Sequence, residues 1–454
     1  MTLFKLKENG TTVGVEAAAG VSTFLAMSYI IFVQPAILGG AGTEANPLDA
    51  GAVMVATCLA SAVACFAMGL LANYPIALAP GMGHNAIFAF TICGAMGLSW
   101  QQALAATFIS GAIFVVLCWV PFREKVLEML PQSLSLSIGA GIGLLITLVG
   151  LEYGGIIVNH PATLVTLGDL GKPGPAVALL GLLVAVVLMA LKFRGAILVS
   201  VAVAAAAGWA GGLVDGSTAG EAASLSSLGQ TAGAFWGGMR GLTDSWAVLL
   251  EVIGILLFLD VFDTVGTLVG VGTRAGFIED DKLPRARWAF LSDALGTVVG
   301  AVLGTSTVTS YVESSAGVQA GGRTGLANMV TGGLFLLSLA ALPLLGYVTF
   351  SVEMSDGQLL YPAIAPALIV VGAMMMQNVG KIDWEDPTEY LPAFLTLVII
   401  PLSFSITHGI VAGVVAYAIL KLVTRRTKEA HWGLYILAGL CVLWYIFLGT
   451  RLGG

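Results

Sequence analysis

Two short stretches, IALAPGMGHNAIFAF (76–90) and TSTVTSYVESSAGVQAGG (305–322), decide the fold. In each, small or strand-forming residues lead into a Gly- or Ser-rich helix start, and neither stretch can cross a bilayer as one uninterrupted helix. Extended backbone at membrane depth must lie within protein or line a cavity, because lipid offers no hydrogen bonds. The two stretches therefore predict short strands that lead into half-helices, which face one another across a binding site.

The rest of the chain has the composition of a membrane protein. Of its 454 residues, 57% are hydrophobic and only 10% are charged, whereas soluble proteins carry about 25% charged residues. Apolar segments predict seven spans before a Gly/Ser-rich stretch at 214–243 and seven after it. For a further apolar segment, 431–448, the sequence leaves open whether it spans the membrane. The predicted spans are 17–39, 50–72, 84–97, 101–121, 136–158, 174–191, 195–213, 245–270, 286–304, 312–321, 326–346, 361–380, 391–407 and 408–423.

The distribution of Lys and Arg agrees with this span count. With a cytoplasmic N-terminus, all but three of the 19 basic residues fall on the cytoplasmic side, where such residues are enriched. Lys172 and Arg240 fall outside, and Arg451 is undecided. The first residues lack the apolar core of a secretory signal. We therefore expect a multi-pass protein of the cell membrane with its N-terminus in the cytoplasm.

Seven spans followed by seven imply that the second half enters the bilayer from the opposite side, as in inverted-repeat transporters. We predict a first repeat at 1–225, a second at 226–430 and an apolar C-terminal segment at 431–454, all within one membrane domain. The stretches 137–155 and 368–384 echo each other at the fifth position of each half. Glycine runs such as SIGAGIG in the first of them favour close helix packing.

Three carboxylates are the main candidates for function. Asp260 and Asp263 lie deep within the apolar stretch 249–271, and Glu313 lies at the start of the second half-helix. An ionisable side chain at bilayer depth costs several kcal/mol, so it is a functional candidate by default. All three are candidates for both substrate binding and proton coupling. The competing interpretation is a buried carboxylate that only braces helices, which is at least as good for Asp293 and Glu251.

Polar and aromatic neighbours complete the predicted site. The amide of Asn85 can both donate and accept hydrogen bonds to a heterocycle, although Asn is also a common helix cap. Tyr29, Phe88 and Phe262 are candidates for stacking on a planar ring or for the apolar core. The hydroxyls of Ser28, Thr264 and Ser314 are the remaining candidates for substrate contact.

Other features are interpreted as structural. Beside Asn85, His84 is expected to pack at a helix interface. Glu16 lies near a membrane boundary and is expected to face water, and the acidic run 383–389 is expected to be a solvated loop. Scattered Cys and His residues give no metal-binding spacing, and a net charge of −7 gives no basic surface for nucleic acid. Enzyme motifs such as a phosphate loop or HExxH are missing from the sequence.

The sequence resembles the AzgA-like adenine, guanine and hypoxanthine permeases of the nucleobase:cation symporter-2 family, which also holds xanthine and uracil permeases. The resemblance runs nearly end to end. It is carried by the stretches 4–38, 77–90, 258–271, 293–326 and 381–410. Gln34, where the family pattern has Asn, and His84 depart from that pattern and bear on base preference.

This resemblance implies an all-α polytopic membrane protein with two inverted sets of seven spans, divided into a core domain and a gate domain. It places the purine site between the third and tenth spans and maps the family's site carboxylates onto Glu313, Asp260 and Asp263, and its asparagine onto Asn85. It does not rank Asp260 against Asp263. The implied function is uptake of a purine nucleobase without an organic cofactor, by proton symport or with sodium as the coupling ion.

Several alternatives stay open at this point. A uracil or xanthine permease fits the same architecture, and an anion transporter fits it less well because the predicted site is acidic. A channel or a membrane enzyme would belong to another functional class. The oligomeric state is also open, although relatives of this fold often pair as homodimers.

Overall fold

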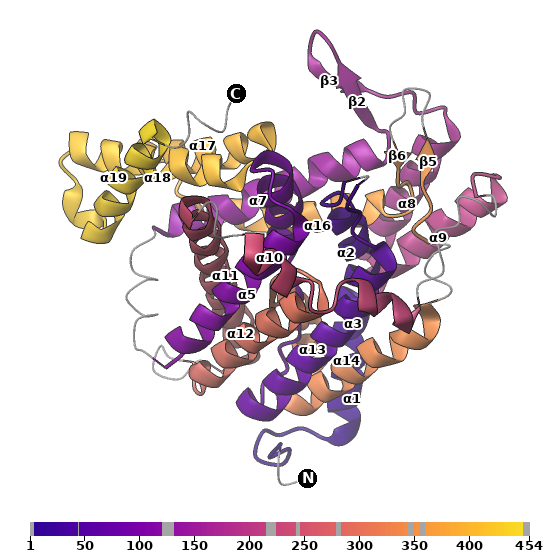
Figure 1. Cartoon of the computed structure of the whole chain (residues 1–454). Coiled ribbons are helices and arrows are strands. Elements are labelled where there is room, and N and C mark those ends of the chain that lie inside the picture. The colour runs from indigo at the N-terminus through magenta and orange to yellow at the C-terminus, as the bar shows by residue number, and fades with distance from the viewer. Residues whose placement is uncertain are drawn as a thin grey trace.

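The computed structural model describes residues 4–43, 45–119, 131–214, 224–241, 246–277, 283–342, 348–353 and 359–447. Helices dominate these residues, and the described strands form three short antiparallel pairs (Figure 1). Each of the fourteen predicted spans corresponds to a helix or to a broken helix, which confirms the predicted fold class.

In the first half, the elements follow the predicted spans in order. They are α1 (Val13–Met27), α2 (Ile30–Gly39), α3 (Ala50–Ala67) with η1 (Met68–Ala72), β1 (Leu78–Pro80), α4 (Met82–Ala86) with η2 (Ile87–Ala95), α5 (Trp100–Leu117), α7 (Gln132–Tyr153), β2 (Ile157–His160), β3 (Leu164–Leu167), α8 (Pro173–Ala190) and α9 (Ala196–Ala210). Side-chain oxygens cap several of these helices, as Thr12 does for α1 and Asp49 for α3.

In the second half, the elements repeat this pattern. They are η3 (Leu225–Gln230), α10 (Phe235–Gly241), α11 (Trp246–Ala275), α12 (Ala286–Leu303), β4 (Val308–Ser310), η5 (Val312–Ser314), α13 (Ser315–Gln319), α14 (Gly325–Ser338) with η6 (Leu339–Ala341), β5 (Val352–Glu353), β6 (Leu359–Leu360), α16 (Ala365–Met375) with η7 (Met376–Lys381), α17 (Pro387–Ser403), α18 (Ile406–Val423), η8 (Thr427–Glu429) and α19 (Trp432–Phe447).

Two differences from the predicted spans stand out. The first span is broken between α1 and α2, at Ser28 and Tyr29. The fifth was predicted to run to residue 158, but α7 ends at Tyr153 because Gly155 takes a left-handed conformation, φ 63°. The chain then forms the β2–β3 hairpin, which projects from the molecule in Figure 1. Only the two strands leading into the half-helices had been predicted.

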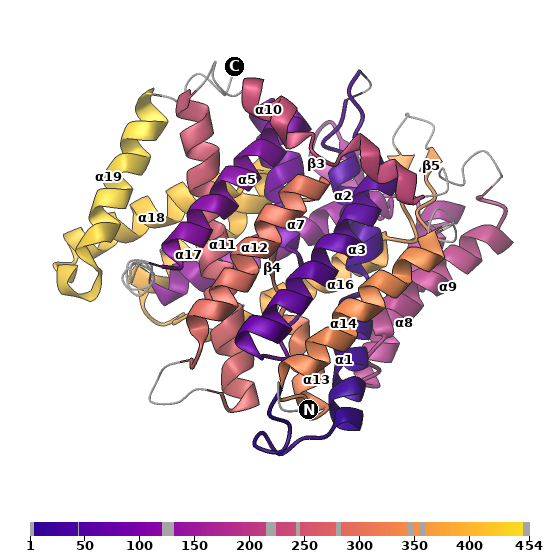
Figure 2. The ribbon, with the colours of Figure 1, turned by 60° about the horizontal axis from the view of Figure 1, so that its bottom comes forward.

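The helices group into two bundles. In the first, α3 packs against α12 and α14, α5 against α11 and α12, and α1 against α14. In the second, α7 packs against α16, α17 and α18, and α8 against α9 and α16. Figure 2 shows the long helices of the first bundle running side by side, with α17, α18 and α19 at the far edge. These bundles match the expected core and gate domains.

Glycines allow α7 and α16 to pack closely in the gate. A Cβ atom at Gly372 on α16 would lie 2.3 Å from the carbonyl oxygen of Gly143 on α7 and 2.1 Å from Thr147 Oγ1. A side chain at Gly372 would therefore force the two helices apart. Gly143 belongs to the glycine run at the fifth position of the first half, and Gly372 lies at the fifth position of the second half. Small residues pack the pseudo-symmetric helices together, as predicted.

β1 and β4 lie at the centre of the core. They pair antiparallel, with Leu78 opposite Ser310 and Pro80 opposite Val308. The two predicted strands, more than 200 residues apart in sequence, thus satisfy each other's backbone within the protein. Each leads directly into its half-helix, β1 into α4 and β4 through η5 into α13.

Two acidic features predicted to face water are buried in the structure or bonded to other side chains. Glu16 is 0% exposed, and its carboxylate accepts hydrogen bonds from the backbone N–H groups of Arg323 and Thr324 at 2.9 and 3.3 Å. It therefore ties α1 to the start of α14. The expectation of a solvated Glu16 was wrong, because the free N–H groups that precede α14 need an acceptor.

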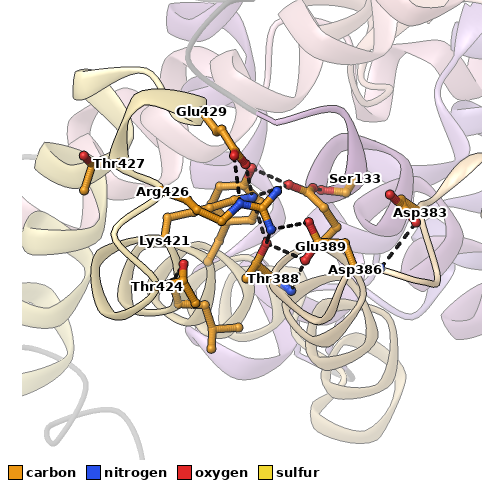
Figure 3. A network of polar contacts seen from close by, with 12 residues as sticks. Ser133, Asp383, Asp386, Thr388, Glu389, Lys421, Thr424, Arg426, Thr427 and Glu429 are labelled. Carbon is orange, nitrogen blue, oxygen red and sulfur yellow. Dashed lines mark hydrogen bonds and ion pairs between the residues drawn. The ribbon is translucent and has the colours of Figure 1, made fainter.

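The run 383–389 is solvated only in part: residues 383–385 are exposed, as predicted. Figure 3 shows Asp386, Thr388 and Glu389 in a polar cluster between α17, α18 and α7, here named the gate cluster. Glu389 accepts hydrogen bonds from Ser133 at 2.5 Å and Tyr417 at 2.8 Å, and it pairs with Lys421 at 2.8 Å. The Lys421 side chain is fully buried. Residues Ser133, Asp386, Thr388, Glu389, Tyr417, Lys421, Arg426 and Glu429 make up this cluster.

At its edge, Asp386 caps α17 and pairs with Arg426 at 2.6 Å. Burial alone would raise the pKa of Asp386, but hydrogen bonds from the backbone N–H and hydroxyl of Thr388 and from Arg426 lower that pKa to about 2. Hydrogen bonds from Arg426 and Lys421 likewise lower the pKa of Glu429. These carboxylates stay charged at any physiological pH.

Candidate functional site

A cavity of about 870 Å³ lies between the two bundles. The core contributes α1, α4, α11, η5 and α13 to its wall, and the gate contributes α7, η7 and the ends of α8, α9 and α16. A cavity of this size can hold a small organic molecule. Since its walls come from both bundles, any relative movement of the bundles would change its shape and access.

Two of the predicted carboxylates line this cavity, Asp263 from α11 and Glu313 from η5. The stripe of α11 that faces the cavity includes Leu259, Asp263, Gly266 and Gly270, at the three- and four-residue spacing of one helix face. The Asp263 side chain is exposed to this space, and that of Glu313 is partly exposed. The structure thus brings together two acids that are 50 residues apart in sequence.

Tyr29 fixes the position of Glu313. Its hydroxyl donates a hydrogen bond to Glu313 Oε1 at 2.6 Å, and the Tyr29 side chain is itself buried. Tyr29 lies at the break between α1 and α2, so the unpredicted break in the first span serves to place this phenol. Within the described residues, neither Glu313 nor Asp263 forms an ion pair with Lys or Arg.

Asp260 occupies a different place. It is 0% exposed and does not line the cavity. Its Oδ2 accepts a hydrogen bond from Thr297 on α12 at 3.2 Å, no N–H or hydroxyl group donates to its Oδ1, and its carboxyl group lies against that of Asp293. Asp260 therefore lies between α11 and α12, whereas Asp263 faces the cavity. The sequence could not tell which of the two aspartates faces the cavity, whereas the packing of α12 against α11 decides it.

Asp293 on α12 joins the helices to the central strands. Its two carboxylate oxygens accept hydrogen bonds from Thr264 at 2.8 Å and Ser310 at 2.9 Å. The Thr264 hydroxyl also lies 3.2 Å from that of Thr309 on β4. Thr264, a predicted substrate contact, is thus buried in a framework that holds β4 against α11. The structural interpretation of Asp293 agrees with these contacts.

A second set of bonds holds the strands and half-helices. Ser306 donates to Asn85 Oδ1, and Gln34 Nε2 donates to Thr305 and Ser306 at 2.9 and 3.0 Å. Ser314 accepts a hydrogen bond from the backbone N–H of Ala77 at 2.9 Å. Asn85 and Ser314 are buried and do not line the cavity.

The other predicted site residues that the structure describes are buried. Phe88 is 0% exposed and belongs to the apolar core, and Ser28 is buried with no hydrogen-bond partner for its hydroxyl. The side chain of Phe262 lies outside the described residues. His84, predicted to pack, does line the cavity, yet it is 1% exposed and neither ring nitrogen has a hydrogen-bond partner.

Sequence reasoning missed the hydrogen-bonding roles of Tyr29, Gln34 and Tyr311. The Tyr311 hydroxyl donates to the carbonyl of Pro80 at 2.5 Å and so joins the starts of both half-helices. Tyr29 had been considered only for ring stacking, and Gln34 only as a departure from a family pattern. A polar side chain inside the apolar span 17–39 was the signal available for Tyr29 and Gln34, whereas Tyr311 stands among Ser and Thr residues just before the predicted span 312–321.

Four basic side chains line the same cavity and are here named the basic mouth. They are Lys192, Arg194, Arg274 and Lys381, all of them exposed. The sequence placed each of them on the cytoplasmic side. The cavity therefore has an acidic part, formed by Asp263 and Glu313, and this basic mouth.

The fold and this site define a multi-pass membrane transporter built from two bundles around an acidic cavity. The model of the permease family Xan_ur_permease matches residues 14–413, and the chain belongs to this family. It is a permease and not an enzyme.

Similar proteins of known name agree with this assignment. The chain is 46% identical to the guanine/hypoxanthine permease PbuG of Bacillus subtilis, with 98% of this chain and 99% of that protein covered. It is 40% identical to the adenine permease AdeP of Escherichia coli, with 99% and 96% covered. The resemblance inferred from the sequence is thus confirmed.

Solved structures share the fold at low sequence identity. The transmembrane domain of the cyanobacterial bicarbonate transporter BicA matches with a TM-score of 0.61 at 13% identity, covering 88% of this chain and 97% of that one. The murine Solute Carrier 26 family member A9 anion transporter, in its inward-facing state, matches with a TM-score of 0.59 at 12% identity, covering 90% and 68%. At such identities the likeness establishes the fold alone.

Proposed function

We propose that this permease carries purine nucleobases, namely hypoxanthine, guanine or adenine, by proton symport. The observation that carries the proposal is the placement of Asp263 and Glu313 on the wall of one cavity, without a basic partner among the described residues. The names of the relatives at 46% and 40% identity support the substrate class. Uptake driven by sodium would overturn the proposed coupling ion, and uptake of uracil or xanthine in place of these bases would overturn the proposed substrate.

The chemistry of recognition follows from the two carboxylates. A purine carries ring N–H groups that can donate to Asp263 and Glu313, and its ring nitrogens can accept from donors near the half-helices. A site built from buried hydrogen-bonding groups rejects analogues that lack a matching donor, because its own polar groups would be left unpaired. Selectivity among bases then depends on which donors and acceptors line up.

Proton coupling would use the same carboxylates. A proton on Glu313 or Asp263 removes a negative charge from the core before that charge crosses the low-dielectric barrier. Tyr29, which donates to Glu313, would hold the carboxylate in place in either protonation state. Asp260, away from the cavity and with one oxygen to which no N–H or hydroxyl group donates, is the second candidate for the coupled proton.

Alternating access would come from movement of the core against the gate, since the cavity lies between them. We assign the basic mouth to the cytoplasmic side, because cytoplasmic loops hold most Lys and Arg. The described conformation is then the inward-facing one.

Uptake of radiolabelled hypoxanthine, guanine, adenine, uracil and xanthine into cells expressing the chain tests the proposal. We expect purine uptake that a protonophore abolishes, that sodium removal leaves unchanged, and that is lost in Glu313→Gln. Glu385→Gln, a matched change at an exposed loop position, serves as the control. Uptake of uracil alone, or sodium-dependent uptake, would overturn the substrate or the coupling ion respectively.

A further inference from the structure

The cavity has more volume than a nucleobase fills, and its wall carries more positive charge than a neutral base requires for binding. Its volume of about 870 Å³ lies in the range of sites for drug-sized ligands, roughly 300–1,000 Å³. A purine held at Asp263 and Glu313 would leave most of this volume to water. The four basic side chains of the mouth line the same cavity and border the space left over.

Those cations come from both bundles and converge on one space. Arg274 belongs to the core, at the end of α11, whereas Lys192 and Arg194 follow α8 in the gate, and Lys381 ends η7. Thr273, Gln319 and Gln377 add hydrogen-bonding groups to the same region of the wall. The preference of basic residues for the cytoplasmic side explains on which side they lie, but not why they line one cavity.

Arg274 links the mouth to the acidic part. It lies 11 residues after Asp263, three turns or about 16 Å along the same face of α11. Its Nη1 lies 3.4 Å from Ser315 Oγ, and Ser315 is only two residues from Glu313. The guanidinium therefore reaches back along the wall toward the acidic part. A ligand bound at Glu313 could extend to Arg274 without leaving the cavity.

The charge of the mouth is not neutralised by described carboxylates. None of the four cations forms an ion pair within the described residues, and the hydrogen bonds recorded for Arg194 and Arg274 go to the hydroxyls of Ser22 and Ser315. The acidic residues at 279–281 lie outside the described residues. Unpaired Lys and Arg beside hydroxyl and amide groups are the usual partners of a phosphate.

We propose that the mouth binds the phosphate of a purine nucleoside monophosphate whose base occupies the Asp263–Glu313 part of the cavity, so that such nucleotides inhibit the permease from the side on which the cavity opens. Once N9 carries the ribose, the base still has its N1–H or exocyclic amino group to donate to these carboxylates. The inference rests on the proposed function, because it needs a purine at the acidic part. Cells convert a free base to its nucleotide by adding a phosphoribosyl group. The product of that class of reaction would thus slow further entry of its precursor.

Inhibition of transport by nucleotides is the direct test. Purified protein is reconstituted in phosphatidylcholine vesicles, and exchange of the radiolabelled base is measured with the matching nucleoside monophosphate on one side at a time. The nucleoside and ribose 5-phosphate are the comparison ligands. We expect inhibition from one side only, with the nucleotide at least about tenfold more potent than either part, because both ends of the site are engaged.

Variants of the mouth assign the phosphate contact. Lys192→Gln, Arg274→Gln and Lys381→Gln should each weaken inhibition, by roughly tenfold for the loss of one charge-assisted hydrogen bond, while the KM for the base stays unchanged. Arg274→Lys should restore part of the effect. Lys172→Gln is the matched control, since Lys172 is an exposed lysine at the opposite end of α8.

Each outcome decides the matter. If the base is exchanged but the nucleotide does not inhibit this exchange, the inference is wrong and the proposed function stands. The same holds if the nucleotide inhibits all three mouth variants as strongly as it inhibits the unchanged chain. Equal inhibition by ribose 5-phosphate would mean that the base end is not engaged. If phosphatidylglycerol in the vesicles abolishes the nucleotide's effect, and the mouth variants remove that competition, the mouth binds a lipid headgroup instead. Absence of base exchange would overturn the proposed function first.

Discussion

Two sets of carboxylates in this permease differ in their partners. In the gate cluster, Glu389 is bound by Ser133, Tyr417 and Lys421, and Asp386 by Thr388 and Arg426. In the cavity, Glu313 is held by one phenol and Asp263 faces open space. A carboxylate paired with cations keeps its charge and its place, whereas one without them can take up a proton or a ligand. The partners indicate which acids serve the structure and which the substrate.

The largest effect is expected for Glu313→Gln. The change keeps the shape of the side chain but removes a charged acceptor, so purine uptake should fall by roughly 10- to 100-fold. The melting temperature of the purified protein should change little, because Tyr29 can still donate to the amide oxygen. Radiolabelled uptake and a thermal unfolding assay measure the two. A large drop in melting temperature with normal uptake would place Glu313 with the structural acids.

Lys421→Ala should lower the stability of the protein and leave base transport unchanged. It leaves Glu389 without its buried partner, and breaking such a pair destabilises by about 2 kcal/mol or more. We expect a melting temperature lower by several degrees and an unchanged KM for the base. Lys428→Ala, an exposed lysine in η8, is the control. Loss of base affinity in Lys421→Ala would show that the gate cluster shapes the site.

Asp386→Asn should lower the melting temperature by less, a few degrees at most, because Asp386 and Arg426 are near the surface. Since the folded pKa of Asp386 is depressed to about 2, its contribution is present above the unfolded pKa of about 4 and is lost as pH falls through 2. The difference between variant and unchanged protein should therefore be constant from pH 8 to pH 5. A difference that shrinks over this window would contradict the assignment.

The smallest effect is expected for His84→Leu. Both imidazole nitrogens are buried without partners, which costs stability, so an apolar replacement should raise the melting temperature of the substrate-free protein slightly. If the ring contacts the base, the KM should also rise a few-fold, measured as uptake at varied base concentration. His84→Asn tests whether a hydrogen-bonding group suffices. Lower stability with an unchanged KM would mean that the ring only fills space.

Much of the architecture could be predicted from sequence. Apolar segments of span length, the bias of basic residues and the two broken stretches at 76–90 and 305–322 each have a local cause, because lipid penalises unpaired backbone and buried charge wherever they occur. Even the strand character of β1 and β4 was readable. The break at Tyr29 was not, because Pro35, the only proline in the stretch 17–39, lies within α2 and not at the break.

The candidate site was predictable only as a set of residues. Asp260 and Asp263 are three residues apart in identical apolar surroundings, and only the packing of α12 buries the first and leaves the second facing the cavity. Glu16 and Glu389 appeared exposed for a similar reason, since their partners lie far away in sequence.

The sequence by itself thus determined the membrane class, the spans and the few acids that are costly to bury, since these depend on each residue's own transfer from water. Only the tertiary structure decided which acids are paired, which face the cavity, and that Lys192, Arg194, Arg274 and Lys381 meet at its mouth. Pairing depends on distance between elements that the chain order does not specify, and in a low-dielectric interior a few ångströms decide the role of a charge.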